Sequence, residues 1–283
     1  MPQNTISQTK FLWLEVTGLC QLECVQCYAG SGPGGTHGSL TAGDWKALIS
    51  EAAHSGVEMV QFIGGEVTLY PGLAELARHA LADGLRVEIF SNLVHISAEQ
   101  WEMLSLPGIS LATSWYTDDP SQHAAITGRD TWRQTKANII KALERQIPLR
   151  AGIIDGIIPA QRAQEARALL ESLGVSSIRT DRVREFGRGS IPAPGQTCGG
   201  CGRGRAAILP DGTVVPCPMS RWRVAGNVRT GKLAALLGEP LSAAAEGLAP
   251  LGPSGQCDPT CVPDSYCDPL CTPGVCSPRT PRA

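Results

Sequence analysis

The segment FLWLEV at residues 11–16 is followed, three residues later, by CQLECVQC at residues 20–27. The first segment is a short apolar run that predicts a buried strand, and the second carries three cysteines spaced C-x3-C-x2-C. Three neighbouring thiolates can hold three corners of an iron–sulfur cube and leave the fourth iron open to another ligand. These residues alone also allow a zinc site or small buried hydrophobic side chains.

Length, charge and composition narrow the class of protein. A chain of 283 residues allows one large domain or two of ordinary size. With 24 basic and 26 acidic residues spread along the chain, no basic patch predicts a nucleic-acid partner. No uninterrupted apolar run could cross a membrane, and residues 1–10 lack the apolar core of a signal peptide. We therefore expect no membrane association and a cytoplasmic location, where eleven cysteines favour metal binding over disulfides.

Apolar runs alternate with helical patterns through the first two thirds of the chain. Thr41 with Asp44, and Ser97 with Gln100, are typical of helix starts, and Asp130 is expected to cap a third helix. Six strand–helix units predict an α/β fold with a parallel sheet, and they are too few for a closed eightfold barrel. We therefore expect an open, partial (β/α)6 TIM-like barrel whose active face lies at the carboxyl ends of the strands. The expected strands are residues 11–16, 57–63, 86–90, 109–113, 148–154 and 177–183, and the expected helices are residues 41–56, 72–82, from 97 onward, 131–145 and 160–173.

The composition changes near residue 186, where Gly and Pro become frequent and the remaining eight cysteines follow. We expect a polar segment at 1–10, the barrel at 11–185, a small cysteine-rich domain at 186–277 and a disordered tail at 278–283. Asp211-Gly212 predicts a hairpin turn that presents Cys217 at the end of its second strand.

The eight later thiols suffice for two four-ligand clusters, so the eleven cysteines divide as three, four and four. The pair Cys198 and Cys201 taken alone could instead be half of a zinc ribbon. The later thiols are Cys198, Cys201, Cys217, Cys257, Cys261, Cys267, Cys271 and Cys276.

Two patterns resemble a known family. C-x3-C-x2-C after a first strand, with Gly64-Gly65-Glu66 about forty residues further on, resembles the radical S-adenosylmethionine (SAM) enzymes. The order of the later cysteines resembles the SPASM extension of that family. The resemblance implies that SAM occupies the open iron at Cys20, Cys24 and Cys27, and that the chain holds three [4Fe–4S] clusters. It would assign Cys198, Cys201, Cys217 and Cys271 to auxiliary cluster I, and Cys257, Cys261, Cys267 and Cys276 to auxiliary cluster II.

The same resemblance implies which residues contact SAM. Gly64, Gly65 and Glu66 would receive its amino group, while Tyr28 would stand in for the adenine contact missing at Gln26. Near the strand ends, Asp119 is a further candidate for a general base. Arg182 and Arg184 are candidates for orienting a carboxylate or a peptide carbonyl. Any of these polar residues could instead cap a helix or form a surface ion pair. Hydrogen bonds to the ribose or the carboxylate of SAM would come from Ser91, Asn92 and Ser114, and a contact to its carboxylate would come from Arg129. The candidates for a general base are Asp118, Asp155 and Asp181.

The function implied is radical chemistry, in which SAM yields a 5′-deoxyadenosyl radical that abstracts a substrate hydrogen. The leading hypothesis is oxidative modification of a ribosomally synthesised peptide, forming a thioether or carbon–carbon crosslink. Its partners would be the precursor peptide and a reducing protein such as flavodoxin or ferredoxin. Since no peptide-binding domain precedes Phe11, the leader would be recognised by the barrel, by the Gly-rich loop at 30–35 or by a separate protein. The alternatives are dehydrogenation of a small molecule such as an amino sugar or alcohol, and a non-enzymatic Fe–S or zinc protein.

Overall fold

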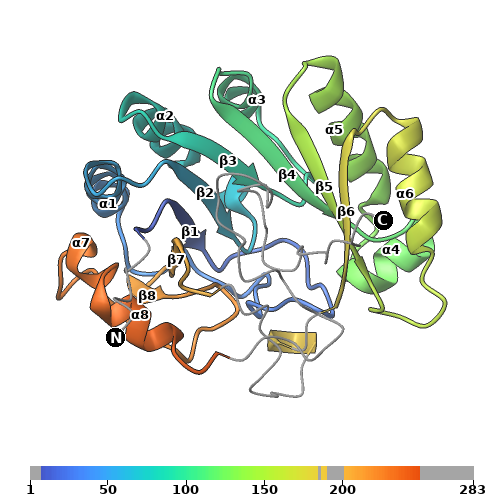
Figure 1. Cartoon of the computed structure of the whole chain (residues 1–283). Coiled ribbons are helices and arrows are strands. Elements are labelled where there is room, and N and C mark those ends of the chain that lie inside the picture. The colour runs from blue at the N-terminus through green and yellow to red at the C-terminus, as the bar shows by residue number, and fades with distance from the viewer. Residues whose placement is uncertain (1–7, 184–185, 190–200, 249–283) are drawn as a thin grey trace, which may run out of the picture.

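The computed structural model describes residues 8–183, 186–189 and 201–248. Six parallel strands form a curved sheet in the order β6-β5-β4-β3-β2-β1, which confirms the predicted α/β partial barrel (Figure 1). The expected strand positions agree with the observed ones to within two residues. The strands are β1 (Phe11–Thr17), β2 (Met59–Gly64), β3 (Arg86–Phe90), β4 (Ile109–Trp115), β5 (Leu149–Asp155) and β6 (Ser177–Arg182).

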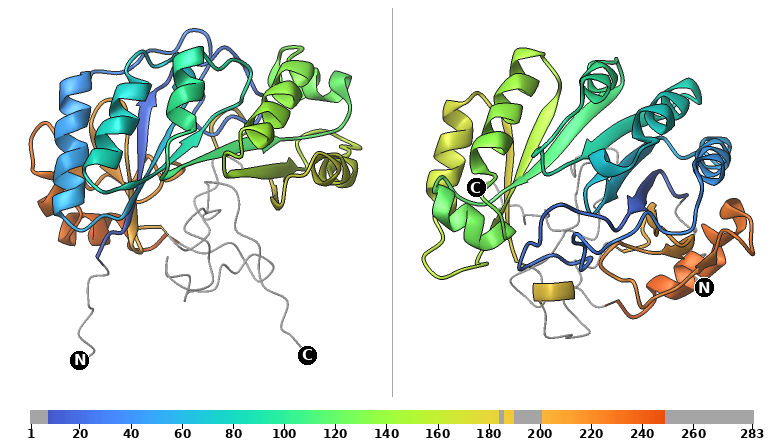
Figure 2. Two further views of the ribbon diagram at one scale, coloured as in Figure 1. Left: turned by 90° about the horizontal axis from the view of Figure 1, so that it is seen from above. Right: turned by 180° about the vertical axis from the view of Figure 1, so that it is seen from behind.

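The helices of the repeats cover the outer face of this sheet, as both views in Figure 2 show. Thr41 and Ser97 each form the expected capping box. The prediction that Asp130 caps a helix was wrong, because Thr131 holds the N-cap position of α5 without a side-chain cap bond. Helix α4 was missed, since it has no apolar stripe to reveal it. The helices are α1 (Ala42–His54), α2 (Leu73–Ala82), α3 (Ala98–Leu104), α4 (Pro120–Thr127), α5 (Trp132–Glu144) and α6 (Ala163–Ser172).

Alternate residues of each strand face opposite sides of the sheet. Leu12 and Leu14 of β1 join the core beneath the helices, whereas Phe11 and Trp13 belong to a second apolar cluster on the concave side. A polar layer also lies within the sheet's concave side. Arg150 donates from Nε and Nη2 to the Glu88 carboxylate at 2.8 and 2.6 Å, and both side chains are almost fully buried.

The sheet continues past the predicted domain boundary. Strand β7 (Arg205–Ile208) pairs in parallel with β1 and turns through the expected Asp211-Gly212 hairpin into β8 (Thr213–Val215). Gly212 takes a φ of 87°, which favours glycine, and its N–H donates to the Leu209 carbonyl at 2.9 Å. The cysteine-rich region thus begins as three further strands of the same nine-stranded sheet. The remaining elements are β9 (Gly226–Asn227), α7 (Leu233–Leu236), α8 (Glu239–Ala245) and the 3-10 turns η1 (Val67–Leu69) and η2 (Gly187–Gly189).

Helix α7 lies beside α1 in Figure 1, where the Glu51 carboxylate accepts a hydrogen bond from the Ala234 N–H at 3.1 Å. This contact fastens the cysteine-rich region to the helical shell of the barrel. Within the part of the chain that the structure describes, no helix combines the length and apolar character needed to cross a bilayer.

Candidate active site

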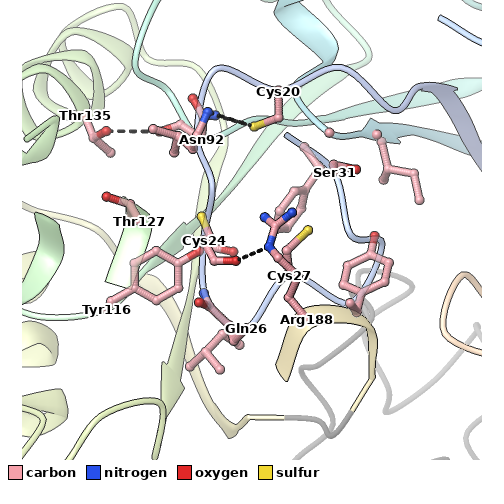
Figure 3. Close-up of a pocket in the computed structure, with 18 of the residues that line it drawn as sticks. Cys20, Cys24, Gln26, Cys27, Ser31, Asn92, Tyr116, Thr127, Thr135 and Arg188 are labelled. Carbon is pink, nitrogen blue, oxygen red and sulfur yellow. Dashed lines mark hydrogen bonds between the residues drawn. The ribbon is translucent and has the colours of Figure 1, made fainter. Parts of the chain in front are cut away.

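A pocket opens at the carboxyl ends of the parallel strands, which is where open α/β sheets bind their ligands. Its empty volume, counted with its open mouth, is about 1140 Å³. The loop after β1 contributes Cys20, Cys24 and Cys27 to its wall, and Figure 3 shows their side chains around the same cavity. The loop after β2 contributes Gly64 and Gly65.

Two segments hold the cysteine loop in place. The carboxyl end of α4 accepts hydrogen bonds from the N–H groups of Glu23 and Val25 at 3.0 and 2.9 Å. On the other side, the Cys20 N–H donates to the Gly32 carbonyl at 3.1 Å. The Gly-rich loop at 30–35 therefore packs against the cysteine loop, and its residue Ser31 lines the pocket.

The three thiols suit an iron–sulfur cube. Burial is the main reason that the pKa of Cys20 is raised to about 11 and that of Cys24 to about 12, and the neighbouring thiols are smaller contributors to both shifts. Cys20 and Cys24 are therefore protonated at neutral pH until a metal replaces the protons. Among the described residues, no three Cys, His, Asp or Glu side chains surround a single ion position. Separate thiols around one cavity fit a cube, because each iron corner takes its own thiolate.

The Gly64-Gly65 backbone is pressed against the cysteine loop. The Gly65 N–H donates to the Thr17 carbonyl at 2.7 Å, and a Cβ on Gly65 would lie 2.4 Å from the Leu19 carbonyl oxygen. Only glycine leaves room for this approach, which brings the end of β2 to the pocket wall.

Glu66 lies behind that wall and does not line the pocket. Its carboxylate is 1% exposed and accepts hydrogen bonds from the Ser91 hydroxyl and the Asn92 N–H, both at 2.7 Å. It also accepts from the Thr68 N–H and hydroxyl at 3.1 and 2.8 Å. Burial raises the Glu66 pKa, while these donors act to lower it. Glu66 and Ser91 thus join the ends of β2 and β3, and their contact with SAM stays a prediction.

Of the other predicted SAM contacts, Asn92, Ser114 and Tyr28 line the pocket. The Asn92 amide donates to the Cys20 sulfur at 3.7 Å, a contact drawn in Figure 3. Arg129 is exposed and is not part of the pocket wall. Counting Gly64 and Gly65, the structure therefore brings five of the predicted contacts together with the thiols and places Arg129 apart from them.

The predicted general bases lie outside the described pocket wall. Asp118 forms a two-bond ion pair with Arg162 at 2.7 Å for each bond, and this pairing holds the pKa of Asp118 below its ordinary value. Asp119 caps α4, and Asp155 accepts from the Gly156 N–H at 2.7 Å. Asp181 lies on β6. Of the two arginine candidates there, Arg184 and the side chain of Arg182 lie outside the described residues.

Several pocket residues were not predicted, and two of them lie beside the cysteine loop. Tyr116 follows β4 and lies beside Cys24 in Figure 3. Arg188 donates from Nε to the Cys24 carbonyl and from its backbone N–H to the Cys27 carbonyl, each at 3.0 Å. Neither residue belongs to a motif, and the sequence Gly187-Arg188-Gly189 indicates only a flexible loop.

Two of the later thiols belong to the described residues. Cys201 and Cys217 are both buried, and the N–H of Gly202 donates to the carbonyl of Pro216, which brings the two cysteines near each other. Burial and then the Glu15 carboxylate are the largest causes that raise the pKa of Tyr28. Negative charge at Cys27 or at Cys217 acts in the same direction. Tyr28 is therefore near both Cys27 and Cys217. The predicted ligands Cys198, Cys257, Cys261, Cys267, Cys271 and Cys276 lie outside the described residues.

Glu66 supports a prediction about stability. Glu66→Gln replaces an oxygen acceptor by an amide donor, which leaves a buried N–H or hydroxyl group without its partner. We expect the free energy of unfolding to fall by about 1–3 kcal/mol, measured by urea denaturation at pH 7. Glu99→Gln is the matched control, because Glu99 is 65% exposed in its ion pair with Arg78. Equal midpoints for the two variants would contradict the role given to Glu66.

Comparison with known proteins places these features in a family. The sequence model of the Radical SAM superfamily matches residues 14–170, which include the cysteine loop and the Gly64-Gly65-Glu66 motif. The SPASM iron–sulfur cluster-binding domain matches residues 198–261.

Individual relatives cover parts of the chain. A PqqA peptide cyclase of Rhodopseudomonas palustris is 37% identical over 102 residues, which are 34% of this chain and 26% of that protein. The sporulation killing factor maturation protein SkfB of Bacillus subtilis is 30% identical over 180 residues, which are 62% of this chain and 43% of that protein. The chain thus spans less than half the length of either relative.

The solved structure of Streptococcus suis SuiB bound to S-adenosylmethionine superimposes with a TM-score of 0.69 at 16% identity, covering 83% of this chain and 67% of that one. This likeness concerns the fold. The cofactors of this chain are SAM and a [4Fe–4S] cluster, with further iron–sulfur binding in the SPASM region. A family match over more than half of the 283 residues, with its three cysteines around one pocket, shows that the chain belongs to the radical SAM superfamily.

Proposed function

We propose that this protein oxidatively modifies a ribosomally synthesised peptide, forming a thioether or carbon–carbon crosslink. One observation in the structure carries the oxidative part of the proposal. The pocket is lined on one side by the three thiols and also by Met219, two residues beyond Cys217. A substrate there would lie between the first cluster and a ligand of auxiliary cluster I.

The names of the relatives support the peptide part. One is a peptide cyclase and another is a maturation protein for a killing factor. An oxidative crosslink removes two hydrogens, so the second electron needs an acceptor inside the protein. Auxiliary cluster I would be that acceptor, because its predicted ligand Cys217 is two residues from the pocket residue Met219.

The residues of this chain would hold and position the reactants. The Gly64 and Gly65 backbone, Asn92, Ser114 and Tyr28 would bind SAM in the pocket, which the three thiols face. When bound, the cluster and SAM together would supply a radical able to abstract a substrate hydrogen. The partly enclosed wall limits water near that radical.

Three further parts of the proposal concern proton release and partners. A base role for Asp118, Asp155 or Asp181 requires a substrate that extends past the described pocket wall, because none of the three lines it. The electron donor would be an external protein of the flavodoxin or ferredoxin class. The leader of the precursor peptide would be bound by this chain or by a separate protein.

The test uses the anaerobically reconstituted protein. We expect about twelve iron per chain, which corresponds to three cubes. With SAM, dithionite and a peptide encoded beside this gene, the peptide should lose two mass units in tandem mass spectrometry. The control reaction omits SAM. Turnover of a free amino sugar, with every neighbouring peptide unchanged, would reject the peptide proposal in favour of small-molecule dehydrogenation.

A further inference from the structure

Arg188 lies on the turn η2, which packs directly on the cysteine loop. A Cβ on Gly187 would lie 2.2 Å from the Cys27 carbonyl oxygen, and Gly187 takes a φ of 60°. The next residue, Arg188, makes one bond to each of two cysteine carbonyls, those of Cys24 and Cys27, at 3.0 Å. Figure 3 shows its guanidinium between these two cysteines.

The other charged side chains near Arg188 differ from it in position or in pairing. Among the described side chains that line the pocket, Arg188 is the one arginine or lysine. Arg221, the other nearby guanidinium, is paired with the buried Glu15 carboxylate. Glu23, whose side chain lies against Gly32 near the Arg188 guanidinium, is an exposed carboxylate. Arg188 is exposed as well, so its charge acts on the cysteine loop at short range, through the Nε bond to the Cys24 carbonyl.

Reduction adds one negative charge to a cluster that three thiolates already make negative. A fixed cation close to the ligands stabilises the reduced form more than the oxidised form, so it raises the reduction potential. A hydrogen bond to a ligand's backbone carbonyl acts in the same direction, because it draws electron density from the peptide beside the thiolate.

We propose that Arg188 is a positioning residue of the first cluster, which holds the turn from Cys24 to Cys27 and makes the cluster easier to reduce. The proposal rests on the cluster that membership of the radical SAM family supplies. It does not depend on the peptide substrate proposed above, since it is tested without any substrate.

The test compares Arg188→Gln with Arg188→Lys in the full-length, reconstituted protein. The potential of the first cluster is measured by an EPR-monitored redox titration with dithionite in the absence of SAM. We expect Arg188→Gln to lower the equilibrium constant for reduction about tenfold, a shift of about 59 mV to more negative potential. Arg188→Lys keeps the charge and should recover most of that shift. Arg78→Gln, which removes an exposed cation from the helical shell, is the control and should not shift the potential.

Each outcome decides the proposal. A loaded cluster with an unshifted potential in Arg188→Gln would overturn it, and so would loss of the cluster in both Arg188 variants, which would indicate a purely structural role. Loss of the cluster in Arg188→Gln alone, with a normal potential in Arg188→Lys, would support it, because Lys keeps the positive charge that Gln lacks. Iron content per chain separates these cases before any titration.

Discussion

Cys24→Ala should abolish the reductive cleavage of SAM. Cys24 is one of three thiols around the pocket, and a cube held by two thiolates has no stable site in that wall. We expect 5′-deoxyadenosine formation to fall below detection by liquid chromatography, with a loss of about four iron per chain. The later cysteines should keep their iron, since the variant does not change them.

Cys217→Ala provides the reciprocal comparison. Cys217 is buried near Cys201 and is absent from the described lining of the pocket. The variant should also lose about four iron per chain, yet it should still convert SAM to 5′-deoxyadenosine when dithionite is supplied. Circular dichroism checks that both variants are folded. Normal 5′-deoxyadenosine formation by Cys24→Ala would contradict the assignment of the first cluster.

The barrel was predictable from sequence because its signals are local. Most of the strands carry short apolar stretches, and the capping boxes at Thr41 and Ser97 mark helix starts through residues three positions apart. Helix α4 has no such apolar pattern, and its role depends on tertiary contacts. Its carboxyl end accepts the N–H groups of Glu23 and Val25, so the missed helix is a support of the cysteine loop.

The site was predictable where chemistry requires a residue type at a fixed spacing, and where polar residues end a strand, as Asn92 and Ser114 do. Cys20, Cys24 and Cys27 belong to such a pattern, as do Gly64 and Gly65, and all five line the pocket. A motif does not tell which side of the wall a side chain takes. Glu66 follows the two glycines in sequence, yet it is turned into the protein, where four donors hold it.

Arg188 shows a second limit of sequence reasoning. It lies more than 160 residues from the cysteine carbonyl that its side chain contacts, and this contact forms only because the sheet curves. The hairpin after residue 204 is similar, since its turn was evident but its pairing with β1 was not. Long-range pairing depends on the packed structure, which local patterns do not encode.

Arg150→Met should destabilise the protein strongly. It leaves the Glu88 carboxylate, which has no exposed surface, without its charged partner. An uncompensated buried charge of this kind costs about 3–5 kcal/mol. We expect the free energy of unfolding to fall by that amount in urea denaturation at pH 7. The matched control is Arg78→Met, which breaks an exposed pair with Glu99 and should change stability by less than about 1 kcal/mol.

The double variant Glu88→Leu with Arg150→Met separates the cost of the orphaned charge from the loss of packing. Two apolar side chains leave no unpaired carboxylate, so most of the lost stability should return. The pair also bears on the pocket, because the Arg150 guanidinium lies 5.9 Å from the ring of Phe90, which lines it. If Arg150→Met and the double variant unfold at the same urea concentration, the buried ion pair is not what the single substitution disrupts, and packing against Phe90 becomes the explanation.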